Sequence, residues 1–73
     1  MMLRNNMEIN NVRYKLTEDV SLTNEITLKK GQEIGVLNYV VYVDGNLIPP
    51  LMQQMFYGFI KNNQNILKDI SNL

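Results

Sequence analysis

Residues 49–59 read PPLMQQMFYGF and form the segment around which the rest of the chain is organised. The stretch after the two prolines contains both phenylalanines and two of the five methionines. Pro49 holds its predecessor extended, and Pro50 can occupy the first turn of a helix, where a missing N–H costs no hydrogen bond. The segment therefore predicts that the one long helix begins at Pro50.

Beyond this segment, apolar residues recur at the helical period of about 3.6 residues. They share one half of the predicted helix surface: Leu51, Met52, Met55, Phe56, Phe59, Ile60, Ile66, Leu67 and Ile70. This pattern predicts a continuous helix over residues 50–70.

Two residues depart from this division. Asn63 falls inside the apolar half, and Tyr57 falls outside it. For Asn63, either the helix ends or bends near Asn62, or a buried amide sets the register against another helix. For Tyr57, the choice is between an exposed ring that covers polar neighbours and a contact residue, since tyrosine is favoured at interfaces.

The chain before the helix indicates short antiparallel strands. Residues 12–17 alternate apolar and polar side chains, which is typical of a half-buried strand. Lys30-Gly31 and Asp44-Gly45 predict tight turns, because glycine tolerates a positive φ. The five residues Tyr39–Val43 form the strongest strand signal. Both faces of that strand are apolar, so it is either covered on both sides or has one face left for a partner.

These elements predict an α+β fold. We expect a single domain over residues 1–73, with a flexible leader at 1–10, a small antiparallel β-meander at 12–48 and a C-terminal α-helix at 50–70. An SH3-like curled sheet or barrel is one form that the meander can take.

The composition excludes several classes of chemistry. The sequence has no cysteine and no histidine, which removes disulfides, the usual zinc and haem ligands, and Cys/His nucleophilic pairs. The acidic residues lack the spacing of a calcium loop. We therefore expect no catalytic residues, no cofactor and no metal. The formal net charge is +0, so nucleic acid is not expected as a partner. The absence of a long apolar run predicts no membrane segment, and with the missing cysteines it indicates the cytoplasm.

The apolar surface suggests a binding function. A half-apolar helix and a strand apolar on both faces offer more hydrophobic surface than a short meander covers, which predicts a homo-oligomer, with a dimer favoured. The expected interface lies on the helix and comprises Met52, Met55, Phe56, Tyr57, Phe59, Ile60, Asn63 and Leu67.

The sequence supports three functional hypotheses. The first is a non-enzymatic protein-binding regulator, such as a viral or accessory inhibitor, because the heavy use of Asn, Ile and Lys suggests an AT-rich genome. The second is an SH3-like or OB-like nucleic-acid-binding module that uses Arg13, Tyr14, Lys15, Lys29 and Lys30. The third is an oligomer that sequesters a nucleotide or another small ligand between its subunits.

Overall fold

The computed structural model describes residues 8–72. Its sheet strands are β1 (Val12–Leu16), β4 (Glu33–Leu37), β5 (Val40–Val43), β6 (Asn46–Leu47) and β7 (Leu67–Asp69). A separate ribbon consists of β2 (Val20–Ser21) and β3 (Thr27–Leu28). The helical elements are the 3-10 turn η1 (Pro50–Met52), the α-helix α1 (Gln53–Asn62) and the 3-10 turn η2 (Gln64–Ile66).

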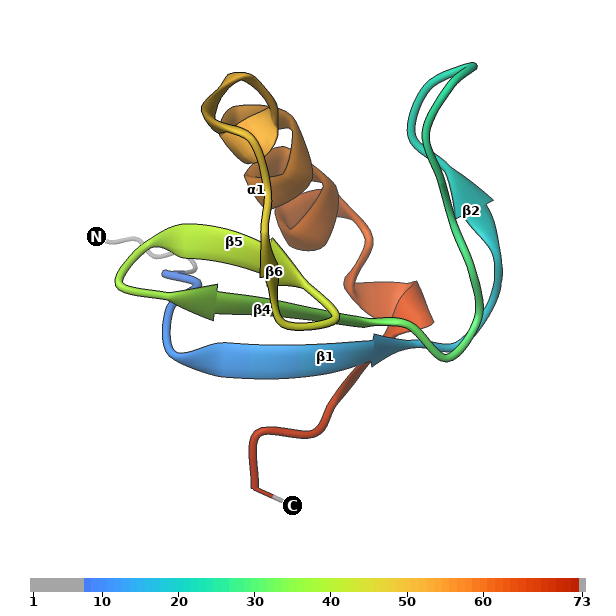
Figure 1. Ribbon diagram of the computed structural model, residues 1–73. Helices are drawn as coiled ribbons and strands as arrows, with labels where there is room; N and C mark the ends of the chain where they lie inside the picture. Colours follow the sequence, from blue (N-terminus) through green and yellow to red (C-terminus); the bar gives the residue numbers. More distant parts are fainter. Residues whose placement is uncertain (1–7, 73) are drawn as a thin grey trace, which may run out of the picture.

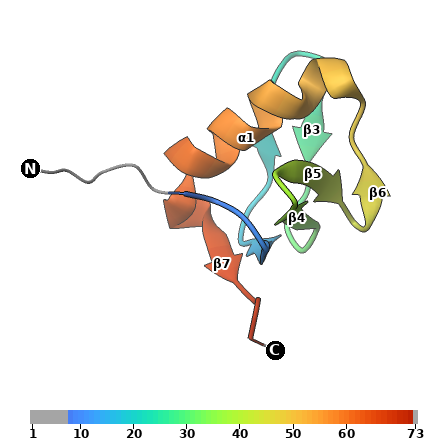
Figure 2. The same ribbon diagram turned by 90° about the vertical axis from the view of Figure 1, so that its left-hand side faces the viewer.

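The predicted α+β class is confirmed. All pairings in the five-stranded sheet are antiparallel, and the strand order is β6-β5-β4-β1-β7. Helix α1 lies over one face of this sheet, whereas the C-terminal end of the chain runs out on the opposite side (Figure 1). The sheet does not close into a barrel, because β6 and β7 are separate edges, as Figure 2 shows. The SH3-like barrel is therefore not formed.

Two tight turns join β4, β5 and β6. The predicted turn at Asp44-Gly45 is present, with φ values of 50° and 82°. The turn between β4 and β5 consists of Asn38 and Tyr39, whose φ values are 53° and 64°. Positive φ at both central residues is the type I′ geometry that matches the twist of a hairpin. The expectation that Tyr39 begins a strand is wrong, since Tyr39 completes this turn.

The ribbon of β2 and β3 forms an arm in the segment of sequence that connects β1 to β4. It stands on the same side of the sheet as α1 (Figure 1). At its tip, the hydroxyl oxygen of Thr23 accepts hydrogen bonds from the N–H groups of Glu25 and Ile26, both at 3.1 Å. At its base, an Asp19 carboxylate oxygen accepts a bond of 2.7 Å from the N–H of Lys30. These bonds replace the ladder that two-residue strands are too short to provide.

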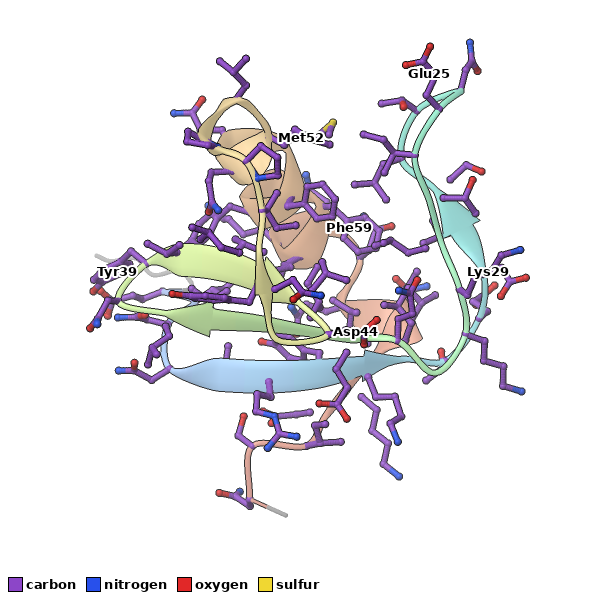
Figure 3. The ribbon with its side chains drawn as sticks, in the orientation of Figure 1. Glu25, Lys29, Tyr39, Asp44, Met52 and Phe59 are labelled. Carbon is purple, nitrogen blue, oxygen red and sulfur yellow. The ribbon has the colours of Figure 1, made fainter. Side chains whose placement is uncertain are left out.

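The core lies between the sheet and α1. Alternate residues of β1 and β4 are buried there, including Tyr14 and Leu16 from β1 and Ile34 and Val36 from β4. Phe59 occupies the space between the helix and the sheet (Figure 3). No polar or charged side chain within residues 8–72 is fully buried. The core is therefore held by apolar packing alone.

The predicted helix over residues 50–70 is wrong beyond Asn62. The side-chain amide of Asn63 donates to the carbonyl of Phe59 at 2.9 Å, and that of Gln64 donates to Ile60 at 2.8 Å. These bonds satisfy carbonyls of the last helical turn, which an ended helix leaves without partners. The chain then turns and adds β7 to the free edge of β1. Of the two interpretations of Asn63, the end of the helix is the correct one.

The flexible leader predicted at residues 1–10 is wrong for its described part. Ile9 is 2% exposed and belongs to the hydrophobic core. The hydroxyl of Tyr57 accepts a bond of 3.2 Å from the N–H of Ile9 and donates one of 3.1 Å to its carbonyl. Helix α1 therefore holds this segment in place. Residues 1–7 of the predicted leader lie outside the described part of the chain.

Candidate functional site

The structure separates the eight residues of the predicted helix interface into two groups. Phe56, Phe59, Ile60 and Leu67 are buried in the core of their own chain. They pack beneath the helix or, for Leu67, in strand β7, so the folded protein does not present them to a partner. Met52, Met55, Tyr57 and Asn63 are half-buried. The first three of these pack against the core, and Asn63 closes the end of α1.

The residues considered for nucleic acid do not form one surface. Tyr14 is buried, and Arg13 forms an ion pair of 2.9 Å with Glu33. Lys29 lies at the base of the arm, away from the sheet (Figure 3). Lys15 alternates with Tyr14 and is exposed on the other side of β1. The structure therefore does not assemble an aromatic and basic platform from this set.

The face of the sheet opposite α1, which we name the open face, carries the main exposed apolar row. Cross-strand partners in an antiparallel sheet point to the same side. Arg13 pairs with Gly35, Gly35 with Tyr42, and Tyr42 with Leu47. One row of side chains thus crosses four strands. In the next row Leu37 pairs with Val40. Leu37 and Leu47 are 54% and 62% exposed, so this face presents apolar side chains that the described chain leaves uncovered.

A hollow of about 410 Å³ opens on this face at Gly35. Its lining includes the side chains of Arg13, Leu37 and Tyr42 and reaches Ser71. A Cβ built on Gly35 would lie 3.4 Å from the carbonyl oxygen of Val12 and 3.5 Å from Cγ of Arg13. The strands pair without interruption on both sides of Gly35, so no bulge forms there. The missing side chain instead leaves the floor of the hollow open.

A third row contains charged residues, of which Glu33 lines the hollow. Lys68 pairs with Lys15, and Lys15 pairs with Glu33. Asp44 follows at the end of β5, where its N–H donates to the carbonyl of Glu33 at 2.8 Å. The pKa of Asp44 is below its ordinary value because the carboxylate accepts bonds from the N–H of Glu33 and the amide of Gln32. The row therefore contains two cationic and two anionic groups at neutral pH.

A second hollow lies beside the helix, between Tyr39 and Tyr57, and is more open to solvent. Gln54 and Gly58 complete its lining together with Gln53. The Tyr39 hydroxyl donates to the carboxylate of Glu8, which raises the pKa of Tyr39 above its ordinary value. Because the tyrosine hydroxyls here bind Glu8 and Ile9, the hollow offers few free polar groups.

Gln53 was not identified from the sequence as a structural residue. Its side-chain oxygen accepts from the N–H of Val41 at 2.7 Å, and its amide nitrogen donates to the carbonyls of Val41 and Ile48 at 3.1 and 2.9 Å. The amide thus acts as a peptide group that continues the ladder at the edge of β5. A polar residue in the first turn after Pro50 carries no signal of this role, because its partners are distant in the chain.

The open-face residues were also missed as a site. The available signal was the strand with two apolar faces, for which one uncovered face was one of the two interpretations. Val41 is buried and its neighbour Tyr42 is only half-buried, so the inner face of β5 is covered and the outer face is not.

No protein family, curated protein or solved structure matches this chain. Among residues 8–72, no three acidic side chains gather in a group that could hold a metal ion. Within the same residues, no helix has both the length and the apolar character needed to cross a membrane. The geometry of the open face is therefore the main guide to function.

Proposed function

We propose that this chain is a small non-enzymatic protein that acts by binding a protein surface with its open face. The observation that carries the proposal is the uncovered apolar row with the hollow at Gly35. Exposed apolar surface of this kind, bordered by charges, is typical of protein-binding sites.

The dimensions of the hollow suit an anchor side chain. A volume of about 410 Å³ accepts a large aliphatic or aromatic group. Binding energy at protein interfaces concentrates in a few such buried anchors, and surrounding polar groups exclude water. The Arg13–Glu33 pair lies at the border of the hollow and can supply that polar rim. Tyr42 adds an aromatic surface beside it.

The mechanism we propose is steric. The open face acts by covering the protein surface that it binds, and no covalent step is involved. The lack of cysteine and the richness in Asn, Ile and Lys support a small viral or accessory regulator that works in the cytoplasm. The helix is no longer the favoured interface, because its largest apolar residues are used in the core.

Site-specific photo-crosslinking tests the proposal. A photoreactive phenylalanine analogue replaces Leu37 on the open face in one variant and Leu51 on the turn before α1 in the control. Both leucines are exposed, and Leu51 is the more exposed at 99%. We expect a discrete protein adduct of one mass from position 37 and none from position 51 in cells that express the chain.

Equal labelling from both positions would show that exposure alone governs the reaction. That result, or no adduct from position 37, would contradict a binding role for the open face.

A further inference from the structure

The charges of the open face are sorted by strand. In the row that crosses the sheet, Lys68 on β7 and Lys15 on β1 are cationic, and Glu33 on β4 is anionic. Asp44, also anionic, follows β5 next to Glu33, and its carboxylate accepts a hydrogen bond from the N–H of Glu33. The order is therefore positive, positive, negative, negative. Arg13, one row further along β1, is also on the cationic side. The cationic half of this row in one copy can therefore face the anionic half of the same row in a second copy.

We infer that the partner of the open face is a second copy of this chain, related by a two-fold axis that runs parallel to the strands between β1 and β4. This inference rests on the proposed function and names its partner. The axis reverses the order of the strands in the second copy. Lys15 of each copy then faces Glu33 of the other, and Lys68 faces Asp44. Both contacts occur twice, as two-fold symmetry requires.

The charges select this axis over its alternative. A two-fold axis in the same plane but perpendicular to the strands leaves the strand order unchanged. It places Lys15 over Lys15 and Glu33 over Glu33 when the charged rows overlap. Like charges brought together at an interface repel each other and suppress wrong arrangements. Only the axis parallel to the strands pairs each cation with an anion.

The same axis also matches shape. In the next row it brings Arg13 of one copy over Gly35 of the other, because these two residues are cross-strand partners on either side of the axis. The side chain of Arg13, which lines the hollow of its own copy and is paired with Glu33 there, thus also faces the hollow of the other copy. Packed sheets lie about 10 Å apart, a gap that long lysine and arginine side chains reach across.

The edge of the sheet is a poorer surface for a second copy. The N–H of Thr17 binds the carbonyl of Ile66, and that of Ile70 binds the carbonyl of Arg13. Leu67 and Asp69 therefore direct their backbone groups away from β1. Antiparallel pairing of β7 with its copy through these groups, centred on the strand, places Lys68 opposite Lys68. Like charges in that position are destabilising, and a lysine is a common protection of an edge.

The size of the face predicts a weak dimer. With this axis β6 has no strand opposite it, so the four strands from β5 to β7 overlap and, at about 4.8 Å apart, make a face roughly 19 Å wide. These strands have three to five residues, so the interface buries below about 1,000 Å² in total, at the weak end of specific association. We therefore expect a dissociation constant in the micromolar range that rises with salt concentration.

Charge reversal with rescue tests the arrangement. The variants are Lys15→Glu and Glu33→Lys, and native mass spectrometry with sedimentation velocity measures association across the micromolar range. Each variant alone places like charges together twice, so we expect its self-association to weaken at least about tenfold. In an equimolar mixture both contacts between residues 15 and 33 of different copies again join opposite charges. We expect a heterodimer, identified by its mass, with an affinity near that of the unmodified chain.

The control is Lys61→Glu, which changes an exposed charge on α1, on the other side of the sheet. It should leave the dimer intact. Thermal melts establish that each variant is folded. Should either charge reversal unfold the chain, Lys15→Ala and Glu33→Gln replace them, and both are expected to weaken the dimer.

Three results would overturn the inference: an unmodified chain that stays monomeric throughout the micromolar range, a dimer that neither reversal weakens, or folded variants that form no heterodimer. A monomer whose position 37 still crosslinks to a different protein would refute the second copy as partner and leave the proposed binding function standing. A monomer with no adduct at position 37 would refute both.

Discussion

The two faces of the sheet use the same strands but differ in what covers them. On β5, Val41 points toward α1 and is 1% exposed, whereas the adjacent Tyr42 points to the open face and remains half-exposed. On β4, Ile34 and Val36 are buried while Leu37 is 54% exposed. The comparison shows that alternation in a strand defines two surfaces, and that a single helix is enough to close only one of them.

The largest expected effect is on the covered face. Phe56→Ala should lower the free energy of unfolding by about 3 to 5 kcal/mol, since it removes a large ring from a packed core. A domain of this size holds on the order of 5 kcal/mol, so much of the protein would unfold. Urea denaturation measures the change. Leu37→Ala on the open face is the control and should cost below about 0.5 kcal/mol. A loss below about 1 kcal/mol for Phe56→Ala would place its ring outside the core.

Loss of the hydrogen bonds that Gln53 makes at the edge of β5 should have the next largest effect. Gln53→Ala leaves the N–H and carbonyl of Val41 and the carbonyl of Ile48 without their side-chain partner. We expect a loss of about 1 to 3 kcal/mol, the cost of unsatisfied, partly buried polar groups. Gln54→Ala changes the same residue type one position later, at an exposed site, and should be nearly neutral. Equal effects from both variants in chemical denaturation would argue against the edge role of Gln53.

A smaller effect is expected on the open face itself. Tyr42→Thr keeps a residue that favours strands and should change the free energy of unfolding by below about 1 kcal/mol. Val41→Ala, on the neighbouring residue of the same strand, should cost more because that side chain is buried. Thermal melts of the two variants at low protein concentration compare the faces directly. If Tyr42→Thr were the more damaging change, the open face would be part of the folding core of a single copy.

The smallest expected effect concerns acid stability. The pKa of Asp44 is lower in the folded chain than its ordinary value of 3.8, so its carboxylate stabilises the fold at pH values above 3.8. This contribution is lost as the pH falls below 3.8 through the lower, folded value. Asp44→Asn should therefore flatten the part of the stability profile below that pH. Urea midpoints between neutral pH and about pH 2.5 provide the measurement. If the variant lost stability below pH 3.8 as the unmodified chain does, Asp44 would be excluded as the source of that loss.

Local patterns predicted the fold class because their causes are local. Residues 12–17 alternate with the period of a strand, and β1 forms there. Asp44-Gly45 accepts positive φ at both positions, and the hairpin forms there. Pro50 begins a helical turn as expected, because the proline ring already has a helical φ. In each case a few neighbouring residues contain the reason for the structure.

The candidate site could not be predicted in the same way. Leu37, Tyr42 and Leu47 come together on one face only through the register of three strands. Gly35 becomes the floor of a hollow only because its partners Arg13 and Tyr42 carry long side chains on either side. The helix-based interface was wrong for Phe56 and Phe59 for the same reason. An apolar stripe predicts burial, but it does not distinguish burial in the same chain from burial against another.

The sequence by itself determined the α+β class, the tight turns and the apolar face of the helix, since these depend on backbone preferences and the spacing of side chains. Only the tertiary structure decided where the helix ends and that a strand succeeds it. The apolar residues of 66–70 continue the helical period, yet Leu67–Asp69 form strand β7. The free edge of β1 offers hydrogen bonds to these residues in the register that sets Leu67 beside Leu16. A distant partner for the backbone outweighed the local pattern, and that partner exists only once the chain has folded.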